Sequence, residues 1–255
     1  MTTADDPSNQ SASARRILGL LDLTSLGDDD QPADVERLCK AAITPFGSVA
    51  AVCIWPRFVP LAVELMAGTD VGVCAVANFP AGKNDSKGAI ADAMTIVDGG
   101  GAEVDVVVPW RDLAAGESGV VTRLVSDVRA AIGAKVTLKA ILETGELSSI
   151  DLVTQAGTEA LEGGADFLKT STGKTAHSAT IEAAAALVKL IAEARRDDGP
   201  GIKISGGVRD RETAERYLQL ADDALGRDWA GPATFRFGAS GLLDDLLAAL
   251  DEPEA

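Results

Sequence analysis

Short apolar segments alternate with segments of helical periodicity along the whole chain, and this alternation restricts the fold more than any other feature. The apolar segments are nearly continuous, as strands of a parallel sheet covered on both faces are. They lie at 17–26, 49–55, 71–79, 103–109, 136–142, 163–175, 202–207 and 234–238. We expect a helix after each of them, at 32–43, 59–67, 86–98, 120–132, 148–162, 179–195, 210–222 and 240–250. Eight such units predict an α/β fold, a single-domain (β/α)8 TIM barrel. A doubly wound sheet is the alternative, but no Gly-x-Gly-x-x-Gly motif follows the first strand.

The barrel accounts for residues 14–250 of the 255, and 46% hydrophobic residues are enough to fill its core. We expect residues 1–13 to be a disordered polar leader and 251–255 a short acidic tail. No apolar run has signal-peptide character or approaches the roughly 18 residues of a membrane span. An odd number of cysteines without paired metal-ligand spacing argues against a disulfide framework, and these are Cys39, Cys53 and Cys74. These features predict a soluble protein of the reducing cytoplasm.

The formal net charge of −16 argues against nucleic acid and anionic membranes as partners, because both require a basic surface. A phosphorylated ligand would have to be held by local donors. The acidic composition fits adaptation to salt and fits solubility alone, and the sequence does not separate the two. The single histidine, His177, argues against zinc-dependent catalysis, so no metal is expected. Its polar surroundings favour a loop or helix-start residue over a catalytic base.

Five of the predicted strands carry a charged residue inside an apolar run, and these are Asp22, Asp105, Lys139, Lys169 and Lys203. A single buried lysine such as Lys169 is most often paired with a carboxylate or reaches the surface. Three lysines on successive strands instead predict a cluster inside the barrel, since alternate residues of a strand point inward. Neighbouring cations lower the pKa of a lysine and make it a nucleophile toward carbonyl groups. The competing interpretation is a buried ion network that only stabilises the barrel.

Glycines at the ends of the last strands predict a phosphate site. Gly206 and Gly207 end the seventh strand, and Gly238-Ala239-Ser240-Gly241 ends the eighth at a helix start. Barrels commonly bind phosphate there on backbone N–H groups. Glycine pairs also end strands for ordinary turn reasons. Gly173-Lys174-Thr175 is not a P-loop, because Leu168 stands where that motif needs a glycine, so we interpret Gly173 and Lys174 as phosphate contacts.

These residues lie in motifs that resemble the deoxyribose-phosphate aldolase family of class I aldolases over nearly the whole chain. The matching motifs are Leu21-Asp22-Leu23-Thr24, Val52-Cys53-Ile54-Trp55-Pro56-Arg57-Phe58, Asn78-Phe79-Pro80, Glu103-Val104-Asp105-Val106-Val107, Leu138-Lys139-Ala140-Ile141-Leu142-Glu143-Thr144-Gly145, Phe167-Leu168-Lys169-Thr170-Ser171-Thr172-Gly173-Lys174, Gly206-Gly207-Val208-Arg209 and Arg236-Phe237-Gly238-Ala239-Ser240.

The resemblance implies that Lys169 forms the Schiff base, that Lys203 activates it and that Asp105 is the acid/base. The implied reaction is reversible cleavage of 2-deoxy-D-ribose 5-phosphate to D-glyceraldehyde 3-phosphate and acetaldehyde, without a cofactor. It also implies a small phosphorylated sugar as partner and a homodimer. The substrate-binding residues would be Asp22, Thr24, Cys53, Lys139, Thr170, Gly173, Lys174, Gly206, Gly207, Gly238, Ser240 and Gly241. Cys53 is not predicted to be a nucleophile, because no base is paired with it in the sequence.

The chain departs from the family pattern at three places. Gly241 stands where many members carry a second serine, Ser205 precedes the glycine pair, and the C-terminal end has no tyrosine, which assists proton transfer in some relatives. Two other functions remain open at this point. One is an imine-forming barrel acting on a different sugar phosphate or a keto acid, and the other is a non-catalytic barrel that binds phosphate esters.

Overall fold

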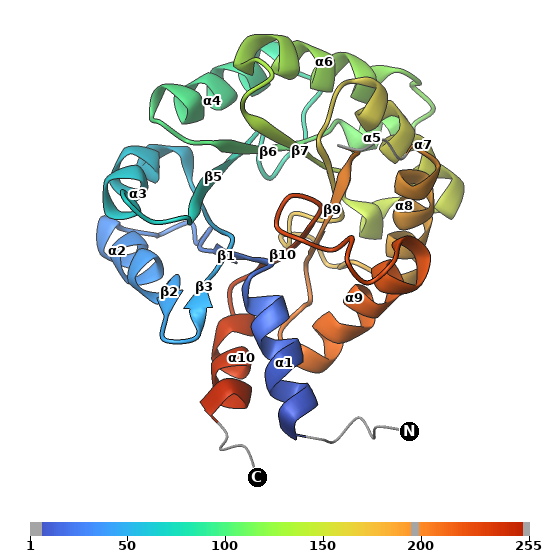
Figure 1. Cartoon of the computed structure of the whole chain (residues 1–255). Coiled ribbons are helices and arrows are strands. Elements are labelled where there is room, and N and C mark those ends of the chain that lie inside the picture. Colours follow the sequence, from blue (N-terminus) through green and yellow to red (C-terminus); the bar gives the residue numbers. More distant parts are fainter. Residues whose placement is uncertain (1–6, 195–198, 252–255) are drawn as a thin grey trace.

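The computed structural model describes residues 7–194 and 199–251, and their centre is a closed barrel of parallel strands (Figure 1). The neighbouring strands follow the order β1, β10, β9, β8, β7, β6, β5, β4, and β4 pairs with β1 to close the ring. The strands are β1 (Leu21–Thr24), β4 (Ala51–Ile54), β5 (Gly72–Ala77), β6 (Glu103–Val107), β7 (Thr137–Ile141), β8 (Phe167–Lys169), β9 (Gly201–Ser205) and β10 (Phe235–Ala239). The predicted TIM barrel is therefore confirmed.

Helices surround the barrel, and one long helix follows each strand as predicted (Figure 1). Four of these helices begin at a residue whose side chain accepts a hydrogen bond from the first turn, namely Asp85, Ser149, Thr180 and Asp210. Such caps satisfy backbone N–H groups that have no partner within the helix. The eight helices are α2 (Pro32–Ala41), α3 (Val59–Leu65), α4 (Ser86–Asp98), α6 (Val120–Ile132), α7 (Ile150–Glu162), α8 (Ile181–Glu193), α9 (Arg211–Leu225) and α10 (Leu242–Asp251).

The N-terminal segment differs from the prediction. Residues 7–13, expected in a disordered leader, belong to helix α1 (Pro7–Leu18), and so do the first two residues of the predicted first strand. The reason is the spacing of Ala14, Ile17 and Leu18, which places three buried side chains on one face of the helix. Helix α1 lies beside α10 (Figure 1). Residues 1–6 of the leader and 252–255 of the acidic tail lie outside the described residues.

Five smaller elements were not predicted, and all occur in the connections between strands and helices. They are the β2 (Ile43–Thr44) and β3 (Gly47–Ser48) hairpin, α5 (Trp110–Ala114) and the 3₁₀ turns η1 (Pro56–Phe58) and η2 (Thr144–Glu146). Within the described ranges, no helix is both long enough and apolar enough to cross a membrane.

Two sets of side chains alternate along the strands. One set, which includes Val104, Val106, Leu138 and Leu168, is buried in the main hydrophobic core together with apolar residues of the surrounding helices. The other set points into the barrel and contains the charged residues. The strand register pairs Asp105 with Lys139 and Lys169 with Lys203, which brings the predicted charges to neighbouring positions. The register of the strands therefore places the candidate site in the polar interior of the barrel.

Candidate active site

Asp105 is the centre of a buried ion network inside the barrel. Its Oδ2 atom lies 2.7 Å from Lys169 Nζ and 2.8 Å from Lys203 Nζ, and its Oδ1 atom lies 3.0 Å from Lys139 Nζ. Asp105, Lys139 and Lys203 are fully buried, and Lys169 is 3% exposed. The structure thus brings together the three lysines predicted from the sequence. Lys169 and Lys203 share one carboxylate oxygen.

A second layer of the network contains Asp22, Glu103 and Arg236. Asp22 pairs with Lys203 at 2.5 Å and also with Arg236, and Glu103 pairs with Lys139 and with Arg236. Sequence reasoning did not select Glu103 and Arg236 as site residues. Both nevertheless share the feature that identified the other members, since each is a charged residue on an apolar strand. With every group ionised, the four cations and three carboxylates leave one excess positive charge.

The charges of the network fix the protonation of Asp105, Lys139 and Lys203. Burial alone would raise the pKa of Asp105, but Lys139, Lys169 and Lys203 hold it well below the usual carboxyl range. Burial alone would lower the pKa of Lys203, but Asp105 and Asp22 raise it above the ordinary lysine value. The pKa of Lys139 is raised in the same way, chiefly by Asp105. Lys203 and Lys139 therefore stay protonated at neutral pH.

Two thiols lie against the same carboxylate. The sequence shows no paired metal-ligand spacing among the cysteines, but Cys53 and Cys74 are paired residues on β4 and β5. Cys74 Sγ donates to Asp105 Oδ1 at 3.1 Å, and Cys53 Sγ lies 3.9 Å from Oδ2. The neighbouring Cys74 thiol lowers the pKa of Cys53 to about 7, helped by the charge of Lys203 and opposed by burial. Strand pairing, which the spacing of the cysteines does not reveal, explains the contact.

The same three groups have metal-ligand spacing, since one ligand atom each of Cys53, Cys74 and Asp105 lies within 4.8 Å of the others. Three ammonium groups already contact Asp105, and Lys139 Nζ lies 3.4 Å from Cys74 Sγ. A further cation would have to enter a region that is already positive. The donor set therefore fits a metal ion poorly.

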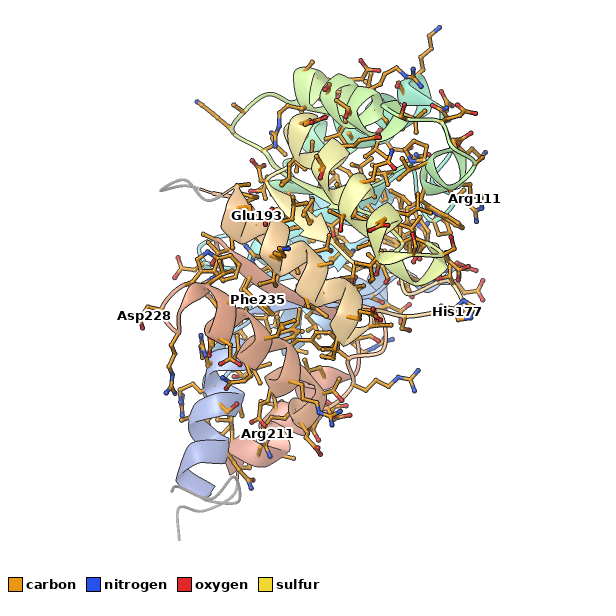
Figure 2. The ribbon with its side chains drawn as sticks, turned by 90° about the vertical axis from the view of Figure 1, so that its right-hand side faces the viewer. Arg111, His177, Glu193, Arg211, Asp228 and Phe235 are labelled. Atoms are coloured by element: carbon orange, nitrogen blue, oxygen red, sulfur yellow. The ribbon has the colours of Figure 1, made fainter. Side chains whose placement is uncertain are left out.

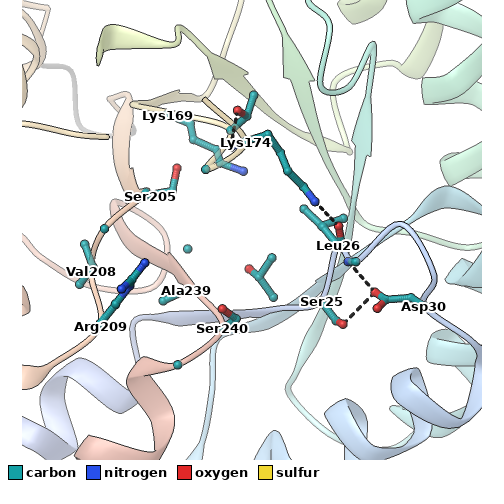
Figure 3. Close-up of a pocket in the computed structure, with 18 residues that line it drawn as sticks. Ser25, Leu26, Asp30, Lys169, Lys174, Ser205, Val208, Arg209, Ala239 and Ser240 are labelled. Atoms are coloured by element: carbon teal, nitrogen blue, oxygen red, sulfur yellow. Dashed lines mark hydrogen bonds between the residues drawn. The ribbon is translucent and has the colours of Figure 1, made fainter. Parts of the chain in front are cut away.

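A pocket of about 460 Å³ opens above the network at the carboxyl ends of the strands (Figure 3). Of the seven charged network residues, only Lys169 lines it. The lysine thus connects the buried charges to the space where a ligand would bind. The other predicted site residues that line the pocket are Thr24, Gly173, Lys174, Gly206, Gly207, Gly238, Ser240 and Gly241.

Four predicted substrate-binding residues do not line the pocket, and each is fully buried. Asp22 and Lys139 are held in ion pairs, and Cys53 lies against Asp105. The hydroxyl of Thr170 donates to the Ser205 carbonyl and accepts from the Ser205 N–H, so it joins the ends of β8 and β9. Contact of these four residues with substrate stays a prediction.

The side of the pocket where the sequence predicts a phosphate site combines glycine backbone with two cations. Gly206 and Gly207 both have left-handed backbone, with φ of 85° and 83°, which β-carbon-bearing residues rarely adopt. Lys174 Nζ crosses from the loop after β8 to donate to the Leu26 carbonyl at 2.6 Å (Figure 3). Arg209 also lines the pocket, and sequence reasoning did not select it as a site residue, although it directly follows the glycine pair and Val208.

His177 lies outside this site, at the surface of the loop before α8 (Figure 2). Its side chain is 71% exposed, and Nδ1 lies 3.1 Å from Glu146 Oε1. The prediction of a loop residue is therefore confirmed.

Comparison with known proteins agrees with this geometry. The sequence model of the DeoC/LacD family of aldolases matches residues 16–247. This chain belongs to that family. It is 44% identical over 239 residues to the deoxyribose-phosphate aldolase of Agrobacterium fabrum, covering 93% of this chain and 91% of the relative. The family resemblance found in the sequence is confirmed.

Two solved structures are similar to this aldolase over nearly their whole length. An apo crystal structure of a candidate deoxyribose-phosphate aldolase from Toxoplasma gondii ME49 has a TM-score of 0.86 and 29% identity, covering 95% of this chain and 98% of that one. The deoxyribose phosphate aldolase of Aeropyrum pernix, described as a unique tetramer, has a TM-score of 0.73 and 25% identity over 96% and 97% of the two chains.

The buried carboxylates make the stability of this aldolase sensitive to acid. The pKa of Asp22 is lowered because Lys203, Lys139 and Arg236 outweigh the effect of burial. A carboxyl group with a lowered pKa stabilises the fold above its unfolded pKa of about 3.9, and this contribution is lost as the pH falls further toward the folded pKa. Asp22→Asn should therefore lower the melting temperature at pH 7, equivalent to about 3–5 kcal/mol for a broken buried pair. Below about pH 4 the difference from the wild type should shrink.

Thermal melts of both proteins between pH 7 and pH 2.5 measure this effect. Asp70→Asn is the matched control, because Asp70 is exposed and makes no ion pair with a described residue. A difference between Asp22→Asn and wild type that stays constant down to the lowest pH would show that ionisation of Asp22 does not stabilise the fold.

Proposed function

We propose that this chain is a class I aldolase that reversibly cleaves 2-deoxy-D-ribose 5-phosphate to D-glyceraldehyde 3-phosphate and acetaldehyde. The observation that carries the proposal is the position of Lys169, which lines the pocket while sharing one oxygen of Asp105 with Lys203. A nucleophilic amine beside a retained cation is the arrangement that imine formation requires. The identity to a deoxyribose-phosphate aldolase supports the choice of substrate.

Charge balance in the network favours Lys169 as the nucleophile. Among the described residues, Lys139 pairs with three carboxylates and Lys203 with two, whereas Lys169 pairs with Asp105 alone. Loss of a proton from Lys169 leaves three cations facing three carboxylates, so the buried network becomes neutral. The neutral amine then attacks the aldehyde carbon C1 of the open-chain sugar. After water leaves, the protonated imine restores the positive charge beside Asp105.

The later steps need proton transfer close to the imine. The protonated imine accepts the electron pair of the C2–C3 bond as it breaks, while the 3-hydroxyl loses its proton and D-glyceraldehyde 3-phosphate leaves. Asp105 and a water molecule can accept that proton, with Lys203 holding the carboxylate in place. A proton then returns to the enamine carbon, and hydrolysis of the imine releases acetaldehyde and the free amine of Lys169. The atoms and charges balance without a cofactor.

The phosphate would bind among the pocket residues that follow β8, β9 and β10. Gly206, Gly207 and Ser240 bring backbone there, and Lys174 and Arg209 bring positive charge. Helix α10 starts just after Ser240 and Gly241, and its N-terminus favours an anion. These local donors would offset the repulsion that the net charge of −16 exerts on a phosphate ester.

A cleavage assay tests the function directly. The purified chain is incubated with 2-deoxy-D-ribose 5-phosphate, and D-glyceraldehyde 3-phosphate is measured by a coupled dehydrogenase. We expect turnover with this sugar and much less with other sugar phosphates or keto acids. Preference for one of those substrates would indicate another imine-forming aldolase, and binding of the phosphate ester without turnover would indicate a non-catalytic barrel.

The proposal also places the enzyme in the cytoplasm. The three cysteines are free thiols, as a reducing cytoplasm favours. The homodimer rests on the family resemblance alone and stays a prediction.

A further inference from the structure

Glu143 occupies an unusual position between β7 and the turn η2. Its backbone is left-handed, with φ of 53° and ψ of 52°, a conformation that few residues other than glycine adopt. The backbone on both sides of Glu143 is bonded to the end of β8 and the residue after it, because Leu142 N donates to the Lys169 carbonyl at 2.9 Å and Thr144 N donates to the Thr170 carbonyl at 2.8 Å. Such conformations persist where the surrounding structure requires them, often at functional sites.

The side chain of Glu143 is fully buried, and all its hydrogen bonds with described residues go to the loop after β8. Its Oε2 accepts from Thr172 Oγ1 at 2.6 Å, and its Oε1 accepts from Thr172 N at 3.1 Å and from Thr175 Oγ1 at 3.2 Å. No Lys, Arg or His nitrogen of the described residues lies within 4 Å of this carboxylate. A buried carboxylate without a cation depends on its hydrogen-bond donors. Here the loop supplies all of them.

The same loop carries the phosphate-side residues Gly173 and Lys174. Thr172 Oγ1, which donates to Glu143, also accepts from Lys174 N at 3.0 Å. Gly173 and Lys174 therefore lie between two threonines that are bonded to one carboxylate. On the outer side, a Cβ at Gly145 would meet the His177 carbonyl oxygen at 2.4 Å, so the turn and the loop are in direct backbone contact.

We propose that Glu143 is a positioning residue that holds the Thr172–Thr175 loop in the conformation that binds the substrate phosphate. It does not line the pocket and does not touch the reacting atoms. This inference rests on the proposed function, and it predicts an effect on phosphate recognition that is separable from the chemistry at Lys169. An amide replaces the carboxylate poorly, because it removes the negative charge and puts an NH2 group where one of the two acceptor oxygens stands, so the Thr172 hydroxyl, or Thr172 N–H and the Thr175 hydroxyl, lose their acceptor.

The test compares two substrates that differ only in the phosphate. In Glu143→Gln, we expect KM for 2-deoxy-D-ribose 5-phosphate to rise about tenfold or more, as loss of a hydrogen bond to a charged group implies. With 2-deoxy-D-ribose, which lacks the phosphate, kcat/KM should stay within about twofold of the wild type, because no hydrogen bond to the phosphate remains to be lost. Thr172→Val removes the hydroxyl between Glu143 and Lys174 and should give the same pattern.

Glu159→Gln is the matched control. Glu159 is also a buried carboxylate without a cation among the described residues, but it accepts from Val121 N and Gln155 at the α6–α7 contact. Its substitution should change the melting temperature and leave KM for both sugars unchanged. Equal losses on both sugars in Glu143→Gln, or an unchanged KM for the phosphorylated sugar, would overturn the positioning role.

A binding measurement keeps this inference distinct from the proposed reaction. The affinity for inorganic phosphate, measured by calorimetry, should be about tenfold weaker in Glu143→Gln than in the wild type. If the wild type cleaves neither sugar, the proposed function fails, and the phosphate affinities still decide the role of Glu143. Equal phosphate affinities in the two proteins would refute it.

Discussion

Replacement of Lys169 by leucine should abolish cleavage of 2-deoxy-D-ribose 5-phosphate, with a loss of kcat/KM on the order of 10⁴-fold or more. The reason is that no other amine of the network lines the pocket. Lys139 and Lys203 are fully buried and are held protonated by two or more carboxylates each, so neither can attack the sugar in its place. Leucine removes the excess positive charge as well, so we expect the variant to fold.

Trapping of the imine identifies the nucleophile independently of the rate. Borohydride reduction in the presence of substrate should attach the sugar-derived fragment to Lys169 in the wild type, and mass spectrometry of the digested protein should locate it. The Lys169→Leu variant should carry no adduct. Lys189→Leu is the control, because Lys189 is an exposed residue of α8, and it should keep both the adduct and the wild-type rate. An adduct on Lys139 or Lys203 would assign the nucleophile to another strand.

Much of the fold could be predicted because eight strands with similar surroundings leave similar patterns in the sequence. Each strand is buried on both faces and reads as an apolar run, and each long helix shows apolar residues on one side. Helix α1 was missed because its leading residues are polar, and its apolar contacts become evident only with α10 in place. The β2–β3 hairpin and α5 are too short to give a periodic pattern.

The candidate site was predicted to the extent that its residues stand out as charges in apolar strands. Asp105, Lys139, Lys169 and Lys203 have that signal and meet in one network. Glu103 and Arg236 also lie on predicted strands, but Glu103 is the first residue of its strand and has no apolar residue before it there, and Arg236, between two phenylalanines, carried the signal without being selected. The contact of Cys53 with Cys74 depends on the register of β4 and β5, which no local pattern encodes.

Asp105→Asn should lower kcat by about 10²–10⁴-fold, the usual contribution of a positioned acid/base. The amide cannot accept the proton of the 3-hydroxyl, and it leaves four cations of the network with two carboxylates. At least one lysine must then lose its proton or the fold must loosen, so the melting temperature should also fall, equivalent to about 3–5 kcal/mol. Borohydride should still trap an adduct on Lys169, since the amine itself is intact.

Asp22→Asn separates the loss of kcat from the loss of stability that Asp105→Asn should cause. Asp22 is equally buried and pairs with the same two lysines, Lys139 and Lys203, but it makes no ion pair with Lys169. Both variants should therefore lose similar stability, whereas the loss of kcat should be at least about tenfold greater in Asp105→Asn, as the contribution of a general acid/base implies. Equal kcat values would mean that Asp105 acts only as a structural charge. A large kcat loss confined to Asp105→Asn would place proton transfer at the carboxylate that Lys169 and Lys203 share.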